Sequence, residues 1–214
     1  MTEAVSAPTL ESQLRAGIGE LGIGMPEGAV PKLLQLVGLL GKWNRTYNLT
    51  AVRQAEQIVS VHLLDSLAVA PHIDGGPVLD VGSGGGFPGL PLALARPELQ
   101  LTLLDSNQKK SAFQRQAVAT LGLTNVEVVC ERVERWRPAR AFQCIVSRAF
   151  SDVADLVAGA AHLLGAGGVF AAMKGAVPHD ELRRLPAGFR VCAVRPLTVP
   201  GLDAQRHLVL VARA

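Results

Sequence analysis

Five glycines within eight residues, directly after a short apolar segment, constrain this chain more than any other feature. Residues 78–81 (Val-Leu-Asp-Val) have the length and composition of a buried strand, and residues 89–95 can form a helix. The glycines lie between these two segments, at positions 82, 84, 85, 86 and 89. Glycine accepts positive φ and lets a ligand approach the backbone closely. The sequence therefore predicts a sharp strand-to-helix turn that is open to a ligand.

The rest of the chain after residue 77 alternates between strand-like and helix-like segments. Further strands are predicted over residues 99–104, 126–130, 142–147 and 169–173, and the intervening helices over 109–121 and 153–164. Ser151 and Asp152 are candidate N-terminal caps of the second helix, and the glycines of 165–168 its stop. Segments 190–195 and 207–212 are predicted to pair as an antiparallel edge. We therefore expect an α/β, Rossmann-like fold whose seven-stranded, mostly parallel sheet has helices on both faces.

The first third of the chain is predicted to be helical. Pro31 suits a first helical turn, and the apolar residues of 33–40 fall on one side of a helix that starts there. A second helix is predicted over residues 54–70, and residues 43–50 are predicted to lie between the two. We expect residues 1–70 to form an N-terminal helical extension and residues 71–214 the sheet domain, the two making one compact unit.

Composition excludes several classes of protein. No apolar stretch reaches the roughly 20 residues of a membrane helix, and residues 1–10 lack the pattern of a secretory signal, so a cytoplasmic protein is expected. The three cysteines and five histidines show no metal-ligand spacing, and no metal is expected. A net charge of +3 does not by itself establish a nucleic-acid partner. The predominance of arginine over lysine fits phosphate binding and genome composition equally well.

The glycine turn is compatible with two classes of ligand. A dinucleotide-binding loop needs Gly-x-Gly-x-x-Gly; the frame that starts at Gly82 fails at Phe87, and the later frame contains Pro88, which lacks a backbone N–H. The other pattern is Asp-x-Gly-x-Gly-x-Gly, formed by Asp80, Gly82, Gly84 and Gly86. A carboxylate before the first glycine suits a ligand with a cationic amino acid end and no diphosphate. S-adenosylmethionine is therefore favoured over NAD or FAD, and over a turn without a ligand.

The ends of the following strands add further candidate residues. Asp105 closes the strand that follows, 25 residues after Asp80, where a carboxylate can accept both hydroxyls of a ribose in either ligand class. Residues 131–134 follow the next strand, where an adenine edge would lie. Arg148 follows the fourth, at the end facing a transferable methyl group, and is either a phosphate or cofactor contact or a surface arginine. Phe150 is our candidate for stacking on an acceptor base; it could equally be a core residue.

These motifs together resemble those of the bacterial 16S ribosomal RNA guanine-N7 methyltransferases of the glucose-inhibited division protein B family (RsmG). The resemblance covers about residues 40–210. It rests on Trp43-Asn44, Tyr47-Asn48-Leu49-Thr50, His62-Leu63-Leu64-Asp65-Ser66, residues 80–92, Leu103-Leu104-Asp105-Ser106, Ser147-Arg148-Ala149-Phe150, Met173-Lys174-Gly175 and Arg206-His207-Leu208. Val61 and Gln205 depart from the family pattern, at positions that bear on RNA contacts and not on the glycine turn.

The resemblance implies a class I S-adenosylmethionine-dependent methyltransferase domain over residues 71–214. Its target would be N7 of a guanine in the 530 loop of 16S ribosomal RNA, as naked RNA or within the 30S subunit. Together, the motif and the resemblance give the predicted cofactor set: Asp80, Gly82, Gly84, Gly86, Phe87, Asp105, Ser106, Asn107, Val133, Glu134 and Arg148. Guanine N7 already carries a free lone pair, so no catalytic general base is expected, and we expect the protein to act as a monomer.

Contacts to RNA are expected from Arg45, Lys174, Arg206 and His207, with Lys109 and Lys110 at the start of a helix. Trp43 and Tyr47 either stack on bases or anchor a helix in the core. His62 and Asp65, three residues apart, are predicted to form a structural hydrogen-bonded pair on one helix face. The alternatives are the same cofactor fold acting on a small molecule or a protein, an RNA-binding protein without activity, and an NAD-dependent oxidoreductase.

Overall fold

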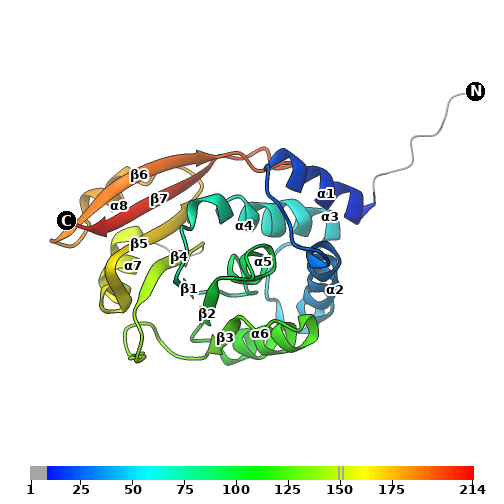
Figure 1. Cartoon of the computed structure of the whole chain (residues 1–214), viewed down its shortest axis with the longest axis horizontal. Helices are drawn as coiled ribbons and strands as arrows, with labels where there is room; N and C mark the ends of the chain where they lie inside the picture. Colours follow the sequence, from blue (N-terminus) through cyan, green and yellow to red (C-terminus); the bar gives the residue numbers. More distant parts are fainter. Residues whose placement is uncertain (1–8, 149, 151) are drawn as a thin grey trace, which may run out of the picture.

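Seven strands form one sheet in the computed structural model, which describes residues 9–148, 150 and 152–214 (Figure 1). The spatial order is β3-β2-β1-β4-β5-β7-β6. The strands are β1 (Pro77–Val81), β2 (Gln100–Leu104), β3 (Val126–Val129), β4 (Phe142–Ser147), β5 (Leu164–Lys174), β6 (Phe189–Leu197) and β7 (Arg206–Arg213). Strands β1 to β5 are parallel to one another, whereas β7 is antiparallel to both β5 and β6. The predicted mostly parallel sheet with an antiparallel edge is confirmed.

Strand β1 lies inside the sheet, between β2 and β4, and its residues 78–81 are all buried. A run of apolar residues fits such a strand because helices cover both of its faces. The side chains of Leu79 and Val81 pack with helix α7 (Val153–Ala160), and Val78 packs on the opposite face with α5 (Gly89–Ala95). The carboxyl ends of β1, β2, β3 and β4 therefore meet at one edge, which is where ligands bind in open α/β sheets.

Two of the helices that follow strands begin at polar caps. The side chain of Asn107 accepts the first N–H groups of α6 (Gln108–Leu121), and Asp152 does the same for α7, as predicted. The other candidate cap, Ser151, lies outside the described residues. The predicted stop at residues 165–168 is wrong, because a 3-10 turn, η3 (Ala161–Leu163), ends the helix earlier and the glycines lie within β5. The short α8 (His179–Arg183) was not predicted.

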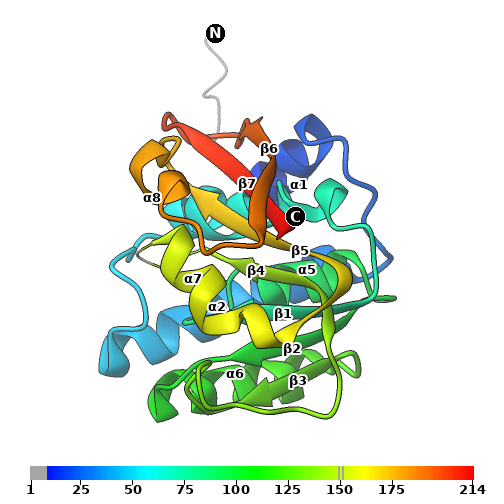
Figure 2. The same cartoon turned by 90° about the vertical axis from the view of Figure 1, so that its left-hand side faces the viewer.

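The N-terminal helices cover one face of the sheet (Figures 1 and 2). They are α1 (Leu10–Glu20), α2 (Ala29–Tyr47), α3 (Ala55–Ile58), the π-helix η1 (Val59–Leu64), α4 (Asp65–Leu67) and η2 (Ala70–His72). The sequence places residues 43–50 between two helices, but α2 continues to Tyr47 and ends only where Asn48 adopts φ +49°. One hydrophobic cluster joins Leu14 of α1 and Leu40 of α2 to Leu103 of β2 and Phe113 of α6.

Candidate functional site

The glycine turn is fastened to the end of the neighbouring strand. After β1 the chain passes through Gly82, Gly84 and Gly86 with φ of +69°, +57° and +81°, a region that side chains disfavour. The N–H of Gly82 donates to the carbonyl oxygen of Leu104 at 2.8 Å. A Cβ on Gly86 would lie 2.3 Å from Cδ1 of Leu90. The predicted strand-to-helix turn is present, and glycine is required in it for both conformation and space.

Asp105, at the end of β2, holds this turn from the side. Its Oδ2 accepts the N–H of Gly84 at 2.9 Å, and its Oδ1 accepts the N–H of Asn107 at 2.8 Å. The residue is only 7% exposed. A carboxylate offers about four acceptor positions, so both oxygens keep capacity for hydroxyl donors. Asp105 thus positions the turn and keeps acceptor capacity for hydroxyl groups of a ligand.

Asp80 lies beneath the turn rather than on its surface. The residue is fully buried, and its Oδ2 accepts the N–H of Gly89 at the start of α5 at 2.8 Å. Its Oδ1 has no hydrogen-bond partner among the described residues. Burial raises the pKa of Asp80 to about 7, although the Gly89 bond and the charge of Arg148 oppose the shift. A cationic ligand above the turn would favour the ionised form of this carboxyl group.

Gln114, in the interior of α6, is a site residue that the sequence does not reveal. Its Nε2 donates to Oγ of Ser83 at 2.9 Å and to the carbonyl oxygen of Gly84 at 2.8 Å. The glutamine is fully buried, so the two bonds are shielded from water. The turn is therefore fastened by two elements, β2 and α6.

A cavity of about 150 Å³ opens at the carboxyl ends of β1 to β3. Five predicted cofactor residues line it: Gly82, Asp105, Ser106, Val133 and Glu134. Phe150, our candidate for stacking on an acceptor base, lines the same cavity. The other six lie around it: Asp80 beneath the turn, Gly84, Gly86 and Phe87 within the turn, Asn107 at the start of α6, and Arg148 in a second cavity.

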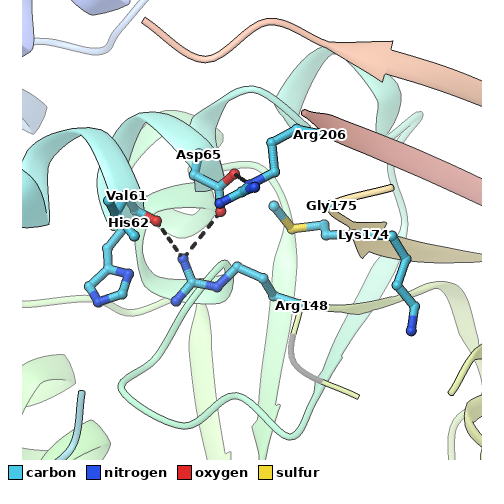
Figure 3. Close-up of a pocket in the computed structure, with 8 residues that line it drawn as sticks. Val61, His62, Asp65, Arg148, Lys174, Gly175 and Arg206 are labelled. Carbon is cyan, nitrogen blue, oxygen red and sulfur yellow. Dashed lines mark hydrogen bonds and ion pairs between the residues drawn. The ribbon is translucent and has the colours of Figure 1, made fainter. Parts of the chain in front are cut away.

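The second cavity, of about 300 Å³, adjoins the ends of β4, β5 and β7 (Figure 3). The buried carboxylate of Asp65 lies between two guanidinium groups in its wall. Oδ1 of Asp65 is 3.0 Å from Nε of Arg206, and Oδ2 is 3.4 Å from Nη1 of Arg148. Each arginine is partly buried, and Asp65 thus offsets two positive charges brought from distant parts of the chain.

The π-helix η1 supplies a further contact to Arg148. The N–H of Asp65 donates to the carbonyl oxygens of Ser60 and His62, and not to the carbonyl oxygen of Val61. In a regular α-helix that carbonyl would accept from Asp65. Here the Val61 oxygen accepts from Nη1 of Arg148 at 3.0 Å instead. The wider turn therefore releases one backbone acceptor to the site, as π-turns often do at functional positions.

His62 is neutral and belongs to a stack of three side chains. Its ring lies 4.9 Å from that of Phe87, and the guanidinium of Arg148 lies 5.2 Å from the Phe87 ring. Nε2 of His62 is 2.8 Å from Oγ1 of Thr50. Burial and the charge of Arg148 lower the pKa of His62 to about 4. The predicted His62–Asp65 hydrogen bond is wrong: the two side chains point apart (Figure 3), His62 contacts Thr50, and Asp65 contacts the two arginines.

The four residues predicted to contact RNA are not all in one place. Lys174 and His207 are cross-strand neighbours in β5 and β7, beside Arg206. Nζ of Lys174 lies 2.8 Å from Oε2 of Glu181 in α8, which also accepts the N–H of Val153. Arg45 lies apart from them, exposed in the last turn of α2. The pairing of Lys174 could not be anticipated, because the helix that carries Glu181 was not predicted.

Residues 9–148, 150 and 152–214 contain neither a cluster of metal ligands nor a membrane-spanning helix. No group of three or more histidine, cysteine, aspartate or glutamate side chains in this part of the chain could hold a metal ion. None of its helices is both long and apolar enough to cross a membrane.

Comparison with known proteins identifies relatives over nearly the whole chain. A family model described as "rRNA small subunit methyltransferase G" matches residues 29–209. A protein of that name from Chromobacterium violaceum is 53% identical over 199 residues, which cover 92% of this chain and 95% of the relative. Another, from Aromatoleum aromaticum, is 53% identical over 214 residues and covers 98% of this chain and 100% of the relative.

Solved structures with a similar fold are more distant in sequence. A glycopeptide N-methyltransferase, MtfA, in complex with S-adenosylhomocysteine has a TM-score of 0.62 at 17% identity, over 72% of this chain and 87% of that one. TrmN from Thermus thermophilus has a TM-score of 0.58 at 21% identity, over 70% of this chain and 48% of that one. At these identities the similarity establishes the class I methyltransferase fold.

Proposed function

This chain belongs to the rRNA small subunit methyltransferase G family, and we propose that it methylates N7 of a guanine in the 530 loop of 16S ribosomal RNA with S-adenosylmethionine as the donor. One observation carries the proposal. The turn fastened by Asp105 and Gln114 borders a cavity at the carboxyl edge of the sheet. Lys174, which lines the second cavity, donates to the carbonyl oxygen of Phe150, which lines the first. A donor in the first cavity and an acceptor base in the second would therefore lie close together.

The residues present fit the donor. The remaining acceptor capacity of Asp105 suits two ribose hydroxyls. The adenine would lie against Ser106, Val133 and Glu134, which line the cavity, with Asn107 next to Ser106 in the chain. The unpartnered Oδ1 of Asp80 lies beneath the turn, where a cationic amino acid end would rest. Small-molecule cavities usually measure about 300–1,000 Å³, so a cavity of about 150 Å³ holds only the nucleoside part. The methionine part would extend over Gly82, Gly84 and Gly86 toward Phe87 and Arg148.

Methyl transfer to N7 requires the protein mainly to position the donor and the acceptor. The donor, when bound, supplies a methyl group on a positively charged sulfur. Guanine N7 attacks with its own lone pair and loses no proton, so a general base is unnecessary, and the neutral His62 is used for packing. Holding the acceptor in line and excluding water account for most of the rate in such a step. The methylated guanine is cationic, and Asp65 is the one carboxylate among the residues that line the second cavity, where it already pairs with Arg148 and Arg206.

The same proposal covers the setting in which the protein works. A ribosomal RNA substrate implies the cytoplasm, as 16S ribosomal RNA or as an assembling 30S subunit. Nothing in the chemistry needs a second copy of the chain, and we propose a monomer. We also propose that residues 1–70 and 71–214 act as one unit, because a common hydrophobic cluster joins α1 and α2 to β2 and α6.

Methylation of RNA from a strain lacking the gene tests the proposal. The protein is incubated with labelled S-adenosylmethionine and either naked 16S ribosomal RNA or 30S subunits, and the labelled nucleotide is mapped. We expect one labelled guanine in the 530 loop. Gly84→Asp, which adds a carboxylate at φ +57° beside Asp105, should abolish labelling. Label in a protein or a small molecule, with unlabelled RNA, would contradict the proposal and support the same fold with another acceptor.

A further inference from the structure

Two neighbouring segments of the chain carry basic residues and no acidic ones. Residues 28–55 and 106–126 together contain seven basic side chains, whereas the rest of the chain has 14 basic and 18 acidic residues. The seven are Lys32, Lys42, Arg45, Arg53, Lys109, Lys110 and Arg115. They lie on α2, on the loop that follows it and on α6, and these two helices pack side by side (Figures 1 and 2). None of the seven is buried.

These cations differ from those of the second cavity in how they are paired. Asp65 contacts Arg148 and Arg206, and Glu181 contacts Lys174. Of the seven, only Lys110 comes within 4.0 Å of a carboxylate, that of Asp105, among the residues the structure describes. The cations on α2 and α6 therefore keep their charge available to an anionic partner.

An exposed aromatic ring lies among these cations. Tyr47 is 43% exposed, and its ring rests 5.1 Å from that of Trp43. Trp43 is half-buried and packs edge-on against Phe113, so it anchors the helix in the core. Nζ of Lys109 lies 6.0 Å from the centre of the Tyr47 ring. Of the two aromatic residues, Tyr47 is thus the one held firmly at the surface, with its ring available for stacking.

This surface reaches both cavities. α6 begins two residues after Ser106, which lines the cavity beside the glycine turn. The loop after α2 is joined to the second cavity through Thr50. Asn44 of α2 accepts the N–H of Thr50, and the hydroxyl of Thr50 contacts His62, which lines that cavity. Arg53 fastens the same loop by donating to Oδ1 of Asn48 at 2.7 Å.

We infer that the α2/α6 basic surface, formed by Lys42, Arg45, Tyr47, Arg53, Lys109 and Arg115, binds a single-stranded or loop segment of the RNA substrate. Tyr47 stacks on one unpaired base, and the basic side chains contact phosphates on either side of it. Unpaired bases can lie on an aromatic ring, whereas bases within a duplex cannot. The inference deepens the proposed function and rests on it, since it names the surface that brings the acceptor to the site.

Matched double variants test the inference. The test variant, Arg45→Glu with Arg115→Glu, reverses two positive charges on the α2/α6 basic surface. The control variant, Arg190→Glu with Arg195→Glu, reverses two positive charges on β6, at the far end of the sheet. Binding to a 16S ribosomal RNA fragment containing the 530 loop is measured by fluorescence anisotropy from 50 to 200 mM salt. We expect at least a tenfold loss of affinity for the first pair and about a twofold loss for the second. S-adenosylhomocysteine should bind both equally well.

Single variants separate stacking from charge. Tyr47→Leu should weaken RNA binding by about tenfold, the loss of one base stack, and Tyr47→Phe should bind like the original. Arg45→Ala and Arg115→Ala should each reduce the slope of log affinity against log salt by about 0.7, the value for one phosphate contact on a single strand. If the double variant fails to fold, these single variants still test whether the α2/α6 basic surface binds RNA. A surface for an acidic protein would bind polyglutamate as tightly as RNA.

The failure of this inference can be told from that of the proposed function. If the original protein methylates no ribosomal RNA, the proposed function is wrong. If it does methylate ribosomal RNA, and the Arg45 and Arg115 pair lowers RNA affinity no more than the β6 pair, the α2/α6 surface is not the docking site. An unchanged affinity for Tyr47→Leu would likewise overturn the stacking.

Discussion

Replacing Asp105 by asparagine tests both the contact that holds the glycine turn and the proposed binding of the donor ribose to this residue. The carboxylate accepts two backbone N–H groups, from Gly84 at 2.9 Å and from Asn107 at 2.8 Å, one on each oxygen. Asparagine has the same shape but only one acceptor oxygen. Its amide nitrogen must therefore face one of the two N–H groups, and no rotation of the side chain satisfies both.

The size of the effect follows from these contacts. A hydrogen bond to a charged group contributes about 1.5–3 kcal/mol, and a buried donor without an acceptor costs about 1–3 kcal/mol. With the residue only 7% exposed, water replaces little of the loss. We expect the free energy of unfolding to fall by about 3 kcal/mol and the midpoint of thermal unfolding by about 6–12 °C. The lost bond to a ribose hydroxyl should weaken donor binding at least about tenfold.

Thermal unfolding followed by circular dichroism and isothermal titration with S-adenosylhomocysteine give the two quantities. Asp74→Asn, at an exposed position away from both cavities, is the matched control and should change neither. If Asp105→Asn left the affinity within threefold of the original, the assignment of Asp105 to the ribose would be wrong. If the midpoint were also unchanged, the role of the carboxylate in holding the turn would be refuted.

Three further substitutions probe other parts of the site. Burial raises the pKa of Asp80 from 3.8 to about 7, so the folded protein should lose up to about 4 kcal/mol of stability between pH 4 and 8 through this group. In urea unfolding, the stability of Asp80→Asn should depend less on pH than that of the original protein. If the two plots of stability against pH were parallel, the burial argument would be refuted. Gly86 and Gly188 have φ of +81° and +84°, but only Gly86 is crowded. Replacement by alanine should lower the free energy of unfolding by about 1–2 kcal/mol at both positions and by about 1–3 kcal/mol more at Gly86. Equal losses of stability in urea unfolding would exclude the effect of crowding. Asp65→Asn leaves two partly buried arginines without their carboxylate and should lower the free energy of unfolding by about 2 kcal/mol. Asp180→Asn, at an exposed position, is the control and should lower it by less than about 1 kcal/mol. If thermal unfolding showed the same loss of stability for both variants, the pairing of Asp65 would be contradicted.

The features that the sequence predicts best are those that depend on neighbouring residues. Segments β4 and α5 have the predicted bounds, because apolar runs, glycine and polar caps act within a few positions. The glycine turn and Asp105 could be located for the same reason: each follows directly from a strand end. The bounds of α2 could not, because its extension to Tyr47 depends on the packing of Trp43 against Phe113 of α6.

The features that the sequence does not predict join residues far apart in the chain. Gln114 reaches back to Ser83 and Gly84, and Asp65 contacts Arg206, 141 positions later. A buried amide in a helix, or a carboxylate next to an apolar run, carries no local sign of its partner. The family motif contains both His62 and Asp65, yet their real partners follow only from how the helices and strands assemble.

The wide turn between Ser60 and Asp65 makes the length of this segment matter as much as its composition. Deleting one residue there would restore the regular α-helical ladder, so the Val61 carbonyl would be taken up within the helix and withdrawn from Arg148. Each residue added to or removed from an α-helix also rotates everything before it by about 100°. The side chains that face α1 would then point elsewhere. Natural variation in this segment should accordingly consist of exchanges of one residue for another, and not of insertions or deletions.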